Sequence, residues 1–477
     1  MLFNSLTFWL FLPIVLALHW AIPSTYKNAR NSLLLLASYT FYGFWDVRFL
    51  SLIVLSTGVD YFAALAMEQG RESQRKTALY ASIIVNLSIL GYFKYANFFL
   101  ESFHDLLNAF GVATSFTSLN ILLPVGISFY TFQSMSYTID VYRRRTRVER
   151  NPMTFALYVA YFAQLMAGPI ERSRVLIPQL NAERKWDSEM FFAGFSRFVL
   201  GMVKKVAISG PLYSWAQSMY LNPTFRSTEE AWAMSAMTML YVLMDFSGYS
   251  DMAIGIGRMT GIRLSENFRS VFKAQNFPDF WQRWHITLGK WFRDYVLISL
   301  TRRKVPKSLA VLLTFTLIGF WHAASWNYLV WGFGLGVLWW LDSRFSWIAR
   351  ATAWIPHEGV IRFFRGSIVI GLFLWIGQLY EAKDLGAAWG LMKSMLGMEA
   401  ETPGITKGFR PLETATWFAL VLALGIEWLT PHWTRWQANP KNTMAIDWVQ
   451  NAVLIPLGII LCFEGLWTSQ AFEYFIF

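Results

Sequence analysis

Long apolar stretches separated by short polar ones recur along almost the whole chain and predict a bundle of membrane-spanning helices. A helix needs about 20 apolar residues to cross the hydrocarbon core of a bilayer. Several stretches are shorter or interrupted by polar residues, so we expect some helices to be tilted, re-entrant or interfacial. With a short extra helix over residues 208–222, we expect about 11 to 14 helices in all. The candidate spans are residues 3–22, 31–46, 48–67, 78–100, 121–140, 153–169, 190–207, 233–259, 308–323, 327–342, 366–380, 413–429 and 451–468.

The composition agrees with a membrane location. Of the 477 residues, 55% are hydrophobic and 15% are charged, whereas about 25% of residues are charged in an ordinary soluble domain. We therefore expect an all-α, polytopic integral membrane protein in which residues 1–477 form a single domain. Cys462 is the only cysteine, so no disulfide can form within the chain. Its apolar surroundings predict a buried, unreactive thiol.

The net charge of +11 is explained by membrane topology, not by nucleic-acid binding. Basic residues gather in short loops at residues 27–30, 71–76 and 143–150, and two predicted spans separate each loop from the next. All three loops therefore lie on one side, which the positive-inside rule makes the cytoplasm, and the N-terminus lies on the opposite side. The chain has no zinc finger, nucleic-acid-binding fold signature or long basic tail.

Two histidines, His285 and His322, stand where an ionisable group is costly. His322 ends an apolar run, residues 309–321, that contains no charged residue. Ionisable groups at membrane depth mark functional sites by default, and imidazole moves protons near neutral pH. For His322, a general base and a structural histidine bonded between helices remain equally open. For His285, the charged and aromatic surroundings favour a structural role over a catalytic one.

Residues 276–300 mix aromatic and charged side chains, and their apolar positions follow helical spacing. This pattern predicts one amphipathic helix that lies at the membrane interface or dips into the bilayer. A plain surface helix with snorkelling basic side chains is the alternative. Residues 383–412 are rich in glycine and more polar, which predicts a loop outside the membrane.

Two carboxylates, Asp245 and Asp251, lie within apolar surroundings and need partners. Asp245 and Asp251 flank a run of small residues typical of tightly packed helices. They could orient a histidine or pair with an arginine, but packing with an internal ion pair is the favoured interpretation. Glu171 and Arg172 could form the mouth of a polar substrate site, although a solvated ion pair at a helix end is simpler. The sequence lacks the motifs of serine hydrolases, P-loop ATPases and zinc proteases.

Seven segments stand out as motifs, and they follow one another between about residues 120 and 335. They are Leu123-Pro-Val-Gly-Ile-Ser-Phe-Tyr-Thr-Phe-Gln133, Tyr137-Thr-Ile-Asp-Val-Tyr142, Gly168-Pro-Ile-Glu171, Asp245-Phe-Ser-Gly-Tyr-Ser-Asp251, Phe280-Trp-Gln-Arg-Trp-His285, Trp291-Phe-Arg-Asp-Tyr295 and Trp321-His-Ala-Ala-Ser-Trp326. Together they resemble the motifs of the membrane-bound O-acyltransferase family, in particular its bacterial branch that acetylates alginate and related exopolysaccharides, and the last segment resembles the histidine motif of the family. Teichoic acid D-alanyl transfer proteins resemble the chain more distantly.

This resemblance implies a helical funnel around His322 near the middle of the membrane, with His322 and His285 as the catalytic pair. Ala323 stands where many relatives have glycine, and a methyl group should be tolerated there. The implied activity is O-acetylation of an exported polysaccharide such as alginate at the bacterial inner membrane. Acetyl-CoA is the expected donor substrate, with no bound cofactor or metal, and a periplasmic acetyltransferase or acceptor protein is the expected partner. The expected substrate-binding or supporting residues are Trp321, Trp284, Arg283, Asp294, Asp245, Asp251 and Glu171.

Two alternatives remain open. The first is transfer of D-alanyl or another acyl group from a carrier protein, whose acidic face could dock on the basic loop at residues 143–150. The second is a polytopic transporter subunit with a proton-relay histidine. Transporters are often built from repeated halves with broken helices in equivalent positions. No such repeat is evident in the sequence, which disfavours transport.

Overall fold

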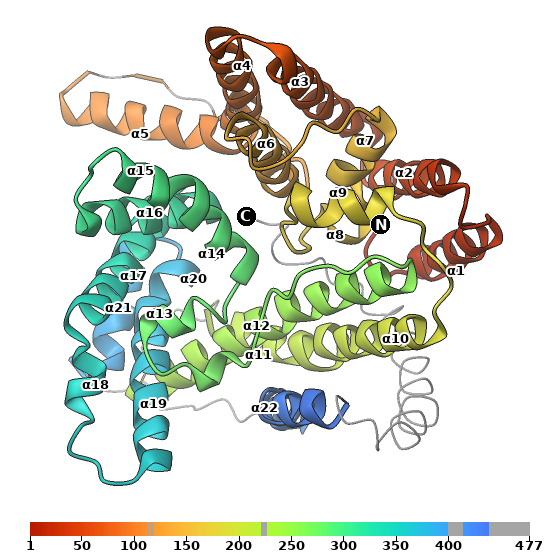
Figure 1. The fold of residues 1–477 in the computed structure, drawn as a ribbon. Coiled ribbons are helices and arrows are strands. Elements are labelled where there is room, and N and C mark those ends of the chain that lie inside the picture. Colours follow the sequence, from red (N-terminus) through yellow and green to blue (C-terminus); the bar gives the residue numbers. More distant parts are fainter. Residues whose placement is uncertain (113, 116–117, 221–226, 399–413, 438–477) are drawn as a thin grey trace. The chain divides into compact units, whose positions relative to one another are not determined.

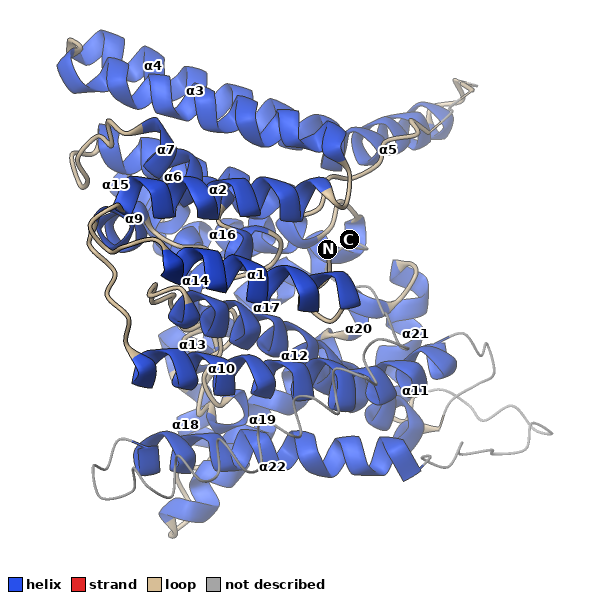
Figure 2. Ribbon diagram, turned by 90° about the vertical axis from the view of Figure 1, so that its right-hand side faces the viewer, coloured by secondary structure: helices blue, strands red, loops and turns tan. Residues whose placement is uncertain are grey.

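The computed structural model describes residues 1–112, 114–115, 118–220, 227–398 and 414–437, and in these residues it consists of helices and loops without strands (Figure 2). The prediction of an all-α polytopic membrane protein is confirmed. Among the described residues, three helical stretches are long and apolar enough to cross a membrane: Val47–Gln69, Glu72–Ala109 and Glu358–Glu381. The predicted span at residues 451–468 and Cys462 lie outside the described residues.

Two compact units divide the chain, residues 1–198 with 252–265 and residues 199–251 with 266–477. The hypothesis of a single domain stays a prediction. The helices that lie in the first unit, or begin in it, are α1 (Leu6–Ala21), α2 (Lys27–Gly43), α3 (Leu50–Gln69), α4 (Glu72–Leu90), α5 (Ala96–Ala109), α6 (Ile127–Tyr142), α7 (Pro152–Ala160), α8 (Phe162–Leu165), α9 (Ser173–Asn181) and α10 (Ser188–Met202).

The second unit holds the helices of the candidate site (Figure 1). The long helix α12 (Thr228–Met259) begins in it and ends in the first unit. The remaining helices are α11 (Gly210–Tyr220), α13 (Phe277–Phe280), α14 (Ile286–Phe292), α15 (Ile298–Arg302), α16 (Lys307–His322), α17 (Trp326–Phe345), α18 (Trp347–Ala351), α19 (Glu358–Ile376), α20 (Gln378–Glu381), α21 (Leu385–Met395) and α22 (Thr414–Gln437), with π-helical stretches at Val203–Ser209 and Arg293–Leu297.

In the first unit, α3, α4 and α6 are joined by a buried carboxylate that the sequence analysis did not single out. Asp60 of α3 accepts hydrogen bonds from the Asn86 amide of α4, at 2.9 and 3.1 Å. The hydroxyls of Ser82 and Ser134 also donate to it. A buried carboxylate is tolerated when its oxygens are hydrogen-bonded, so this cluster cross-links three helices.

The predicted span at residues 153–169 is wrong as one helix, because α7 ends at Ala160 and Tyr161 leaves the helical conformation. Polar side chains replace the missing helical hydrogen bonds. The Phe162 amide donates to the Ser38 hydroxyl at 3.0 Å, and the Gln164 amide donates to the Tyr158 carbonyl at 3.0 Å. Irregular backbone is acceptable inside a membrane protein where neighbouring groups satisfy it in this way.

Residues 276–300 do not form the one amphipathic helix that the sequence predicts. The helix is interrupted at His285, whose φ is 41°.

The prediction of a loop over residues 383–412 is wrong in part. Helix α21 occupies Leu385–Met395, and Asp384 caps its N-terminus by accepting from the Ala387 amide at 2.8 Å. The loop prediction for residues 399–412 lies outside the described residues. The short helix expected at residues 208–222 is confirmed as α11.

Two glycines that face each other hold the α16–α17 hairpin together. A Cβ at Gly319 would lie 2.1 Å from the Tyr328 carbonyl oxygen and 2.9 Å from the Gly332 Cα. A Cβ at Gly332 would lie 2.4 Å from the Phe315 carbonyl oxygen. Any larger side chain at either position would therefore push the two backbones apart.

We predict that Gly319→Ala destabilises the protein by about 1–3 kcal/mol, as expected for overpacking. Thermal unfolding in detergent measures the effect. The matched control is Gly58→Ala in α3, where an added Cβ has no neighbour within 4 Å. The control should be neutral or slightly stabilising because alanine favours the helix, and equal effects of the two substitutions would contradict the close-contact argument.

Candidate active site

His322 is the last residue of α16, and residues 323–325 connect it directly to α17. Ser325 caps α17 by accepting from the Tyr328 amide at 3.4 Å. The Gly319–Gly332 contact precedes His322 in the chain and the Ser325 cap follows it, so the backbone is held in place on both sides of His322. Its side chain is only 7% exposed.

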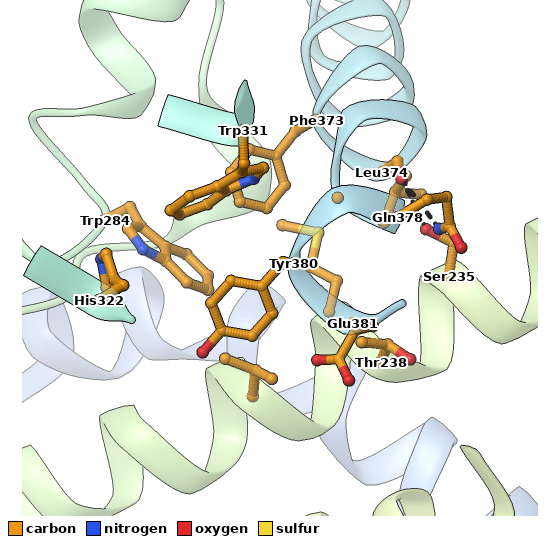
Figure 3. A pocket seen from close by; sticks show the side chains of 13 residues that line it. Ser235, Thr238, Trp284, His322, Trp331, Phe373, Leu374, Gln378, Tyr380 and Glu381 are labelled. Carbon is orange, nitrogen blue, oxygen red and sulfur yellow. Dashed lines mark hydrogen bonds between the residues drawn. The ribbon is translucent and has the colours of Figure 1, made fainter. Parts of the chain in front are cut away.

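A cavity opens beside His322 (Figure 3). Its empty volume is about 540 Å³, which includes space open to the surroundings. The His322 ring meets Trp331 edge to face, with centroids 5.4 Å apart, and Tyr380 at 6.2 Å. Aromatic walls around one polar ring are typical of small-molecule sites. The lining residues are Ser235, Thr238, Met239, Val242, Trp284, His322, Trp331, Phe373, Leu374, Gly377, Gln378, Tyr380 and Glu381.

His285 is held by Asn267. Its Nδ1 lies 3.1 Å from the Asn267 Oδ1, which also accepts from the Thr287 amide at 3.2 Å and hydroxyl at 2.9 Å. The backbone amide of Thr287 can only donate, so the atom that faces it and His285 is the Asn267 oxygen, and the Asn267 amide nitrogen then donates to the Ser250 hydroxyl at 3.2 Å. A neutral His285 therefore carries its proton on Nδ1 and presents Nε2 as the basic nitrogen. Because its backbone is left-handed, His285 is also a strained position.

Trp321 lies between the two histidines. Its ring centroid is 5.0 Å from that of His322 and 6.1 Å from that of His285. His285 also packs edge to face against Phe246 of α12 at 4.6 Å. The structure thus brings the two predicted catalytic residues and Trp321 into one cluster, in which His322 lines the cavity and His285 lies outside its lining. Trp284, the neighbour of His285, also lines the cavity.

Asp245 and Asp251 form internal ion pairs, as the favoured interpretation expected, although their partners are lysines. The Lys204 Nζ lies 2.7 Å from the Asp251 Oδ2, and Lys205 pairs with Asp245. All four side chains are less than 10% exposed. Between the pairs, a Cβ at Gly248 would lie 2.8 Å from the Gly201 carbonyl oxygen. These carboxylates therefore fasten α12 to the π-helical stretch Val203–Ser209, and neither lines the cavity.

Three other predicted site residues also lie outside the cavity lining. Arg283 pairs with Asp279 at 2.8 Å, and Asp294 pairs with Arg293 at 2.8 Å. Glu171 belongs to the first unit, is 0% exposed, and accepts from the amide and hydroxyl of Ser265. The hypothesis of a solvated ion pair at Glu171 is therefore wrong. Within the described ranges, no three His, Cys, Asp or Glu side chains are grouped to hold a metal ion.

The polar end of the cavity is formed by residues that the sequence did not indicate. Glu381 accepts a hydrogen bond from the Tyr241 hydroxyl at 3.1 Å, and Thr238 lines the same end. The Ser235 hydroxyl and the Gln378 amide both donate to the Leu374 carbonyl, at 2.8 and 3.3 Å. The available clue was a pair of polar residues, Gln378 and Glu381, after a strongly apolar helix, but no motif drew attention to them.

Comparison with known proteins agrees with the motif resemblance. The model of the membrane-bound O-acyltransferase family matches residues 16–353. A probable alginate O-acetylase AlgI of Azotobacter vinelandii is 39% identical over 405 residues, 83% of this chain and 78% of that protein. A protein of the same description from Pseudomonas putida is 35% identical over 498 residues, 100% of this chain and 99% of its own length. A peptidoglycan O-acetyltransferase of Helicobacter pylori is 32% identical over 431 residues, 83% of this chain and 80% of its own.

We predict that Asn267→Ala destabilises the protein by about 1–3 kcal/mol, because it leaves buried donors of His285 and Thr287 without their acceptor. Thermal unfolding of the purified protein checks this. Asn108→Ala, at an exposed asparagine that contacts His104, is the control. A loss no larger than that of the control would show that Asn267 does not hold the strained turn at His285.

We also predict that Asp251→Ala, which leaves Lys204 buried without this partner, destabilises the protein by about 3–5 kcal/mol. The double variant Lys204→Met with Asp251→Ala should regain part of that loss, because no uncompensated lysine remains. The matched control is Glu358→Ala, which breaks an exposed ion pair with Arg362 and should leave stability nearly unchanged. Chemical denaturation of all three variants in the same detergent measures the differences. Equal losses in the single and double variants would contradict the ion-pair argument.

Proposed function

This chain belongs to the membrane-bound O-acyltransferase family, and on that premise we propose that it acetylates an exported polysaccharide at the bacterial inner membrane. Family membership makes it a polytopic membrane acyltransferase. The proposal adds that the donor is cytoplasmic acetyl-CoA and that the acetyl group crosses the membrane through the site at His322. The relatives named above are described as probable alginate O-acetylases and a peptidoglycan O-acetyltransferase, so alginate is the first acceptor to test.

The observation that carries the proposal is the placement of His322 at the wall of the cavity. In the chemical step, His322 accepts the proton of an acceptor hydroxyl while that oxygen attacks the carbonyl carbon of the acetyl thioester. The new C–O ester bond forms, the C–S bond breaks, and the thiolate leaves and takes up a proton. Positioned general-base catalysis of this kind accelerates a reaction by about 10²–10⁴.

The surrounding rings restrict how the His322 imidazole can turn. Trp321, Trp331 and Tyr380 each pack against it at steep angles, from 76° to 81°. A base held in one orientation loses little freedom in the transition state. His285 contributes through Trp321, whose ring it contacts, and is therefore a positioning residue in this proposal.

The proposal also includes where the acetyl donor binds, which is the cytoplasmic side of the membrane. Acetyl-CoA carries phosphates, and basic cytoplasmic loops attract anionic ligands. The exposed basic side chains of the loops at residues 27–30, 71–76 and 143–150 fit that role when the N-terminus is periplasmic, whereas Arg30 and Arg75 are buried and donate to backbone carbonyls. On the far side of the membrane, the acetyl group passes to the polysaccharide directly or through a periplasmic acetyltransferase or acceptor protein.

We predict that His322→Ala lowers consumption of acetyl-CoA by at least about 10²-fold, the lower end expected when a general base is lost. The assay uses the purified chain in liposomes with label in the acetyl group. His357→Ala is the matched control, because it removes the same side chain at an exposed position before α19. The control should keep wild-type activity.

If folded His322→Ala consumes the thioester as fast as the wild type, His322 is structural and the proposed site is wrong. If the wild type ignores acetyl-CoA but consumes a D-alanyl thioester on a carrier protein, the donor assignment is wrong and the alternative within the family holds.

A further inference from the structure

The end of the cavity that lies away from His322 is polar (Figure 3). The whole lining belongs to the second unit. Tyr380 lies between this end and His322, so the cavity has a histidine at one end and hydrogen-bonding groups at the other. The polar side chains of this end are Ser235, Thr238, Gln378 and Glu381.

Two polar atoms at this end have no hydrogen-bond partner in the described part of the chain. The Gln378 side-chain nitrogen donates to the Leu374 carbonyl at 3.3 Å, so its Oε1 remains as an acceptor. Neither this oxygen nor the Thr238 Oγ1 makes a hydrogen bond with the described residues. Gln378 is 1% exposed and Thr238 is 7% exposed. Buried polar atoms nearly always have a partner, so these two are expected to bind a group that the chain does not supply.

The other polar side chains of this end already have partners. The Ser235 hydroxyl donates to the Leu374 carbonyl at 2.8 Å, and the Tyr241 hydroxyl donates to Glu381 at 3.1 Å. A ligand at this end therefore bonds to the Gln378 oxygen, which accepts, and to the Thr238 hydroxyl, which can donate. A hydroxyl group fits both atoms, because it donates and accepts. Such binding needs no charge on Glu381.

The helices that carry the cavity have their basic residues at the opposite end. Helix α16 begins after the basic segment at residues 302–307 and ends at His322. Helix α17 runs back to the basic residues within 344–350, and α19 starts near those within 362–365 and leads to Gln378. The positive-inside rule predicts that these basic ends are cytoplasmic. His322 and the polar end of the cavity are then nearer the periplasm, the side from which an exported acceptor arrives.

We propose that Thr238 and Gln378 form an acceptor subsite, which binds one hydroxyl of a sugar residue while another hydroxyl of the same residue faces His322. The role of the second hydroxyl rests on the proposed function, because His322 is the base there. A few polar groups in a largely apolar, aromatic cavity are what orients a small ligand.

This subsite favours a sugar over a protein side chain as the direct acceptor. A pyranose ring carries several hydroxyls, so it can occupy both ends of the cavity at once. The single hydroxyl of a serine has to lie at His322, which leaves Thr238 and Gln378 without partners. The acceptor is therefore the polysaccharide itself and not a serine of a periplasmic protein.

The test is equilibrium binding of a mannuronate oligomer to the purified full chain in detergent. Thr238→Val nearly keeps the size of the side chain and removes the hydroxyl, so it should weaken binding about tenfold, as expected for one lost hydrogen bond. Gln378→Met removes the accepting oxygen and should weaken binding by a similar factor. Because the Thr238 hydroxyl has no partner in the free protein, Thr238→Val should not lower the thermal unfolding temperature. A purely structural hydroxyl would give the reverse, a lower unfolding temperature with unchanged binding.

Thr316→Val in α16 is the matched control, because that hydroxyl donates to the Leu312 carbonyl of its own helix at 2.8 Å and lies outside the cavity lining. It should leave binding unchanged. The proposal is overturned if the wild type does not bind the oligomer, or if folded Thr238→Val and Gln378→Met bind it as tightly as the wild type.

Consumption of labelled acetyl-CoA by the same preparations separates this proposal from the proposed function. A chain that binds the sugar through Thr238 but does not consume acetyl-CoA supports the subsite and refutes the proposed function. A chain that consumes acetyl-CoA through His322, with sugar binding that does not depend on Thr238 or Gln378, refutes the subsite alone.

Discussion

The close contact of Gly319 with Gly332 is the constraint on which the candidate site depends. It brings the backbones of α16 and α17 together in a place where any Cβ would collide with a carbonyl oxygen. Because His322 follows Gly319 by one helical turn, this contact sets how far the imidazole reaches into the cavity. The aromatic rings of Trp331 and Tyr380 then fix its orientation. Two small residues therefore position the His322 side chain without touching it.

The rest of the chain shows how a largely apolar protein accommodates polar groups. Where a helix breaks, at Tyr161 and at His285, side chains of other segments take over the lost backbone hydrogen bonds. Where a charge is buried, as at Asp60 or Asp251, hydroxyls, amides or a lysine satisfy it. Leaving such groups unsatisfied in apolar surroundings costs several kcal/mol each, on the order of the stability of a small domain. The irregular segments are thus as constrained as the helices.

Much of the fold and the main histidine could be predicted from the sequence, because both depend on local patterns. The apolar run before His322 predicts a helix that ends there, and α16 does so. The break at His285 could not be predicted, since helical spacing continues across it and Asn267, which holds the turn, lies 18 residues away. Glu381 was missed for the same reason. Its hydrogen-bond partner Tyr241 lies 140 residues away in the chain, so no local sequence pattern indicates that the two residues meet. The helix at Leu385–Met395 was missed because its glycines predict a loop, and the helix-capping residue Asp384 was not recognised.

The central claim is that His322 acts as a base on the acceptor hydroxyl, and chemical rescue tests it most directly. The variant His322→Gly removes the imidazole and leaves a space of its size beside the cavity. We expect added imidazole to restore acetyl transfer in this variant in proportion to its concentration, and to leave the wild type and His285→Gly unaffected. Restored activity would show that the missing function is proton transfer at that position. If the folded variant retains full activity without imidazole, or gains none with it, His322 does not act as the base and the account is wrong.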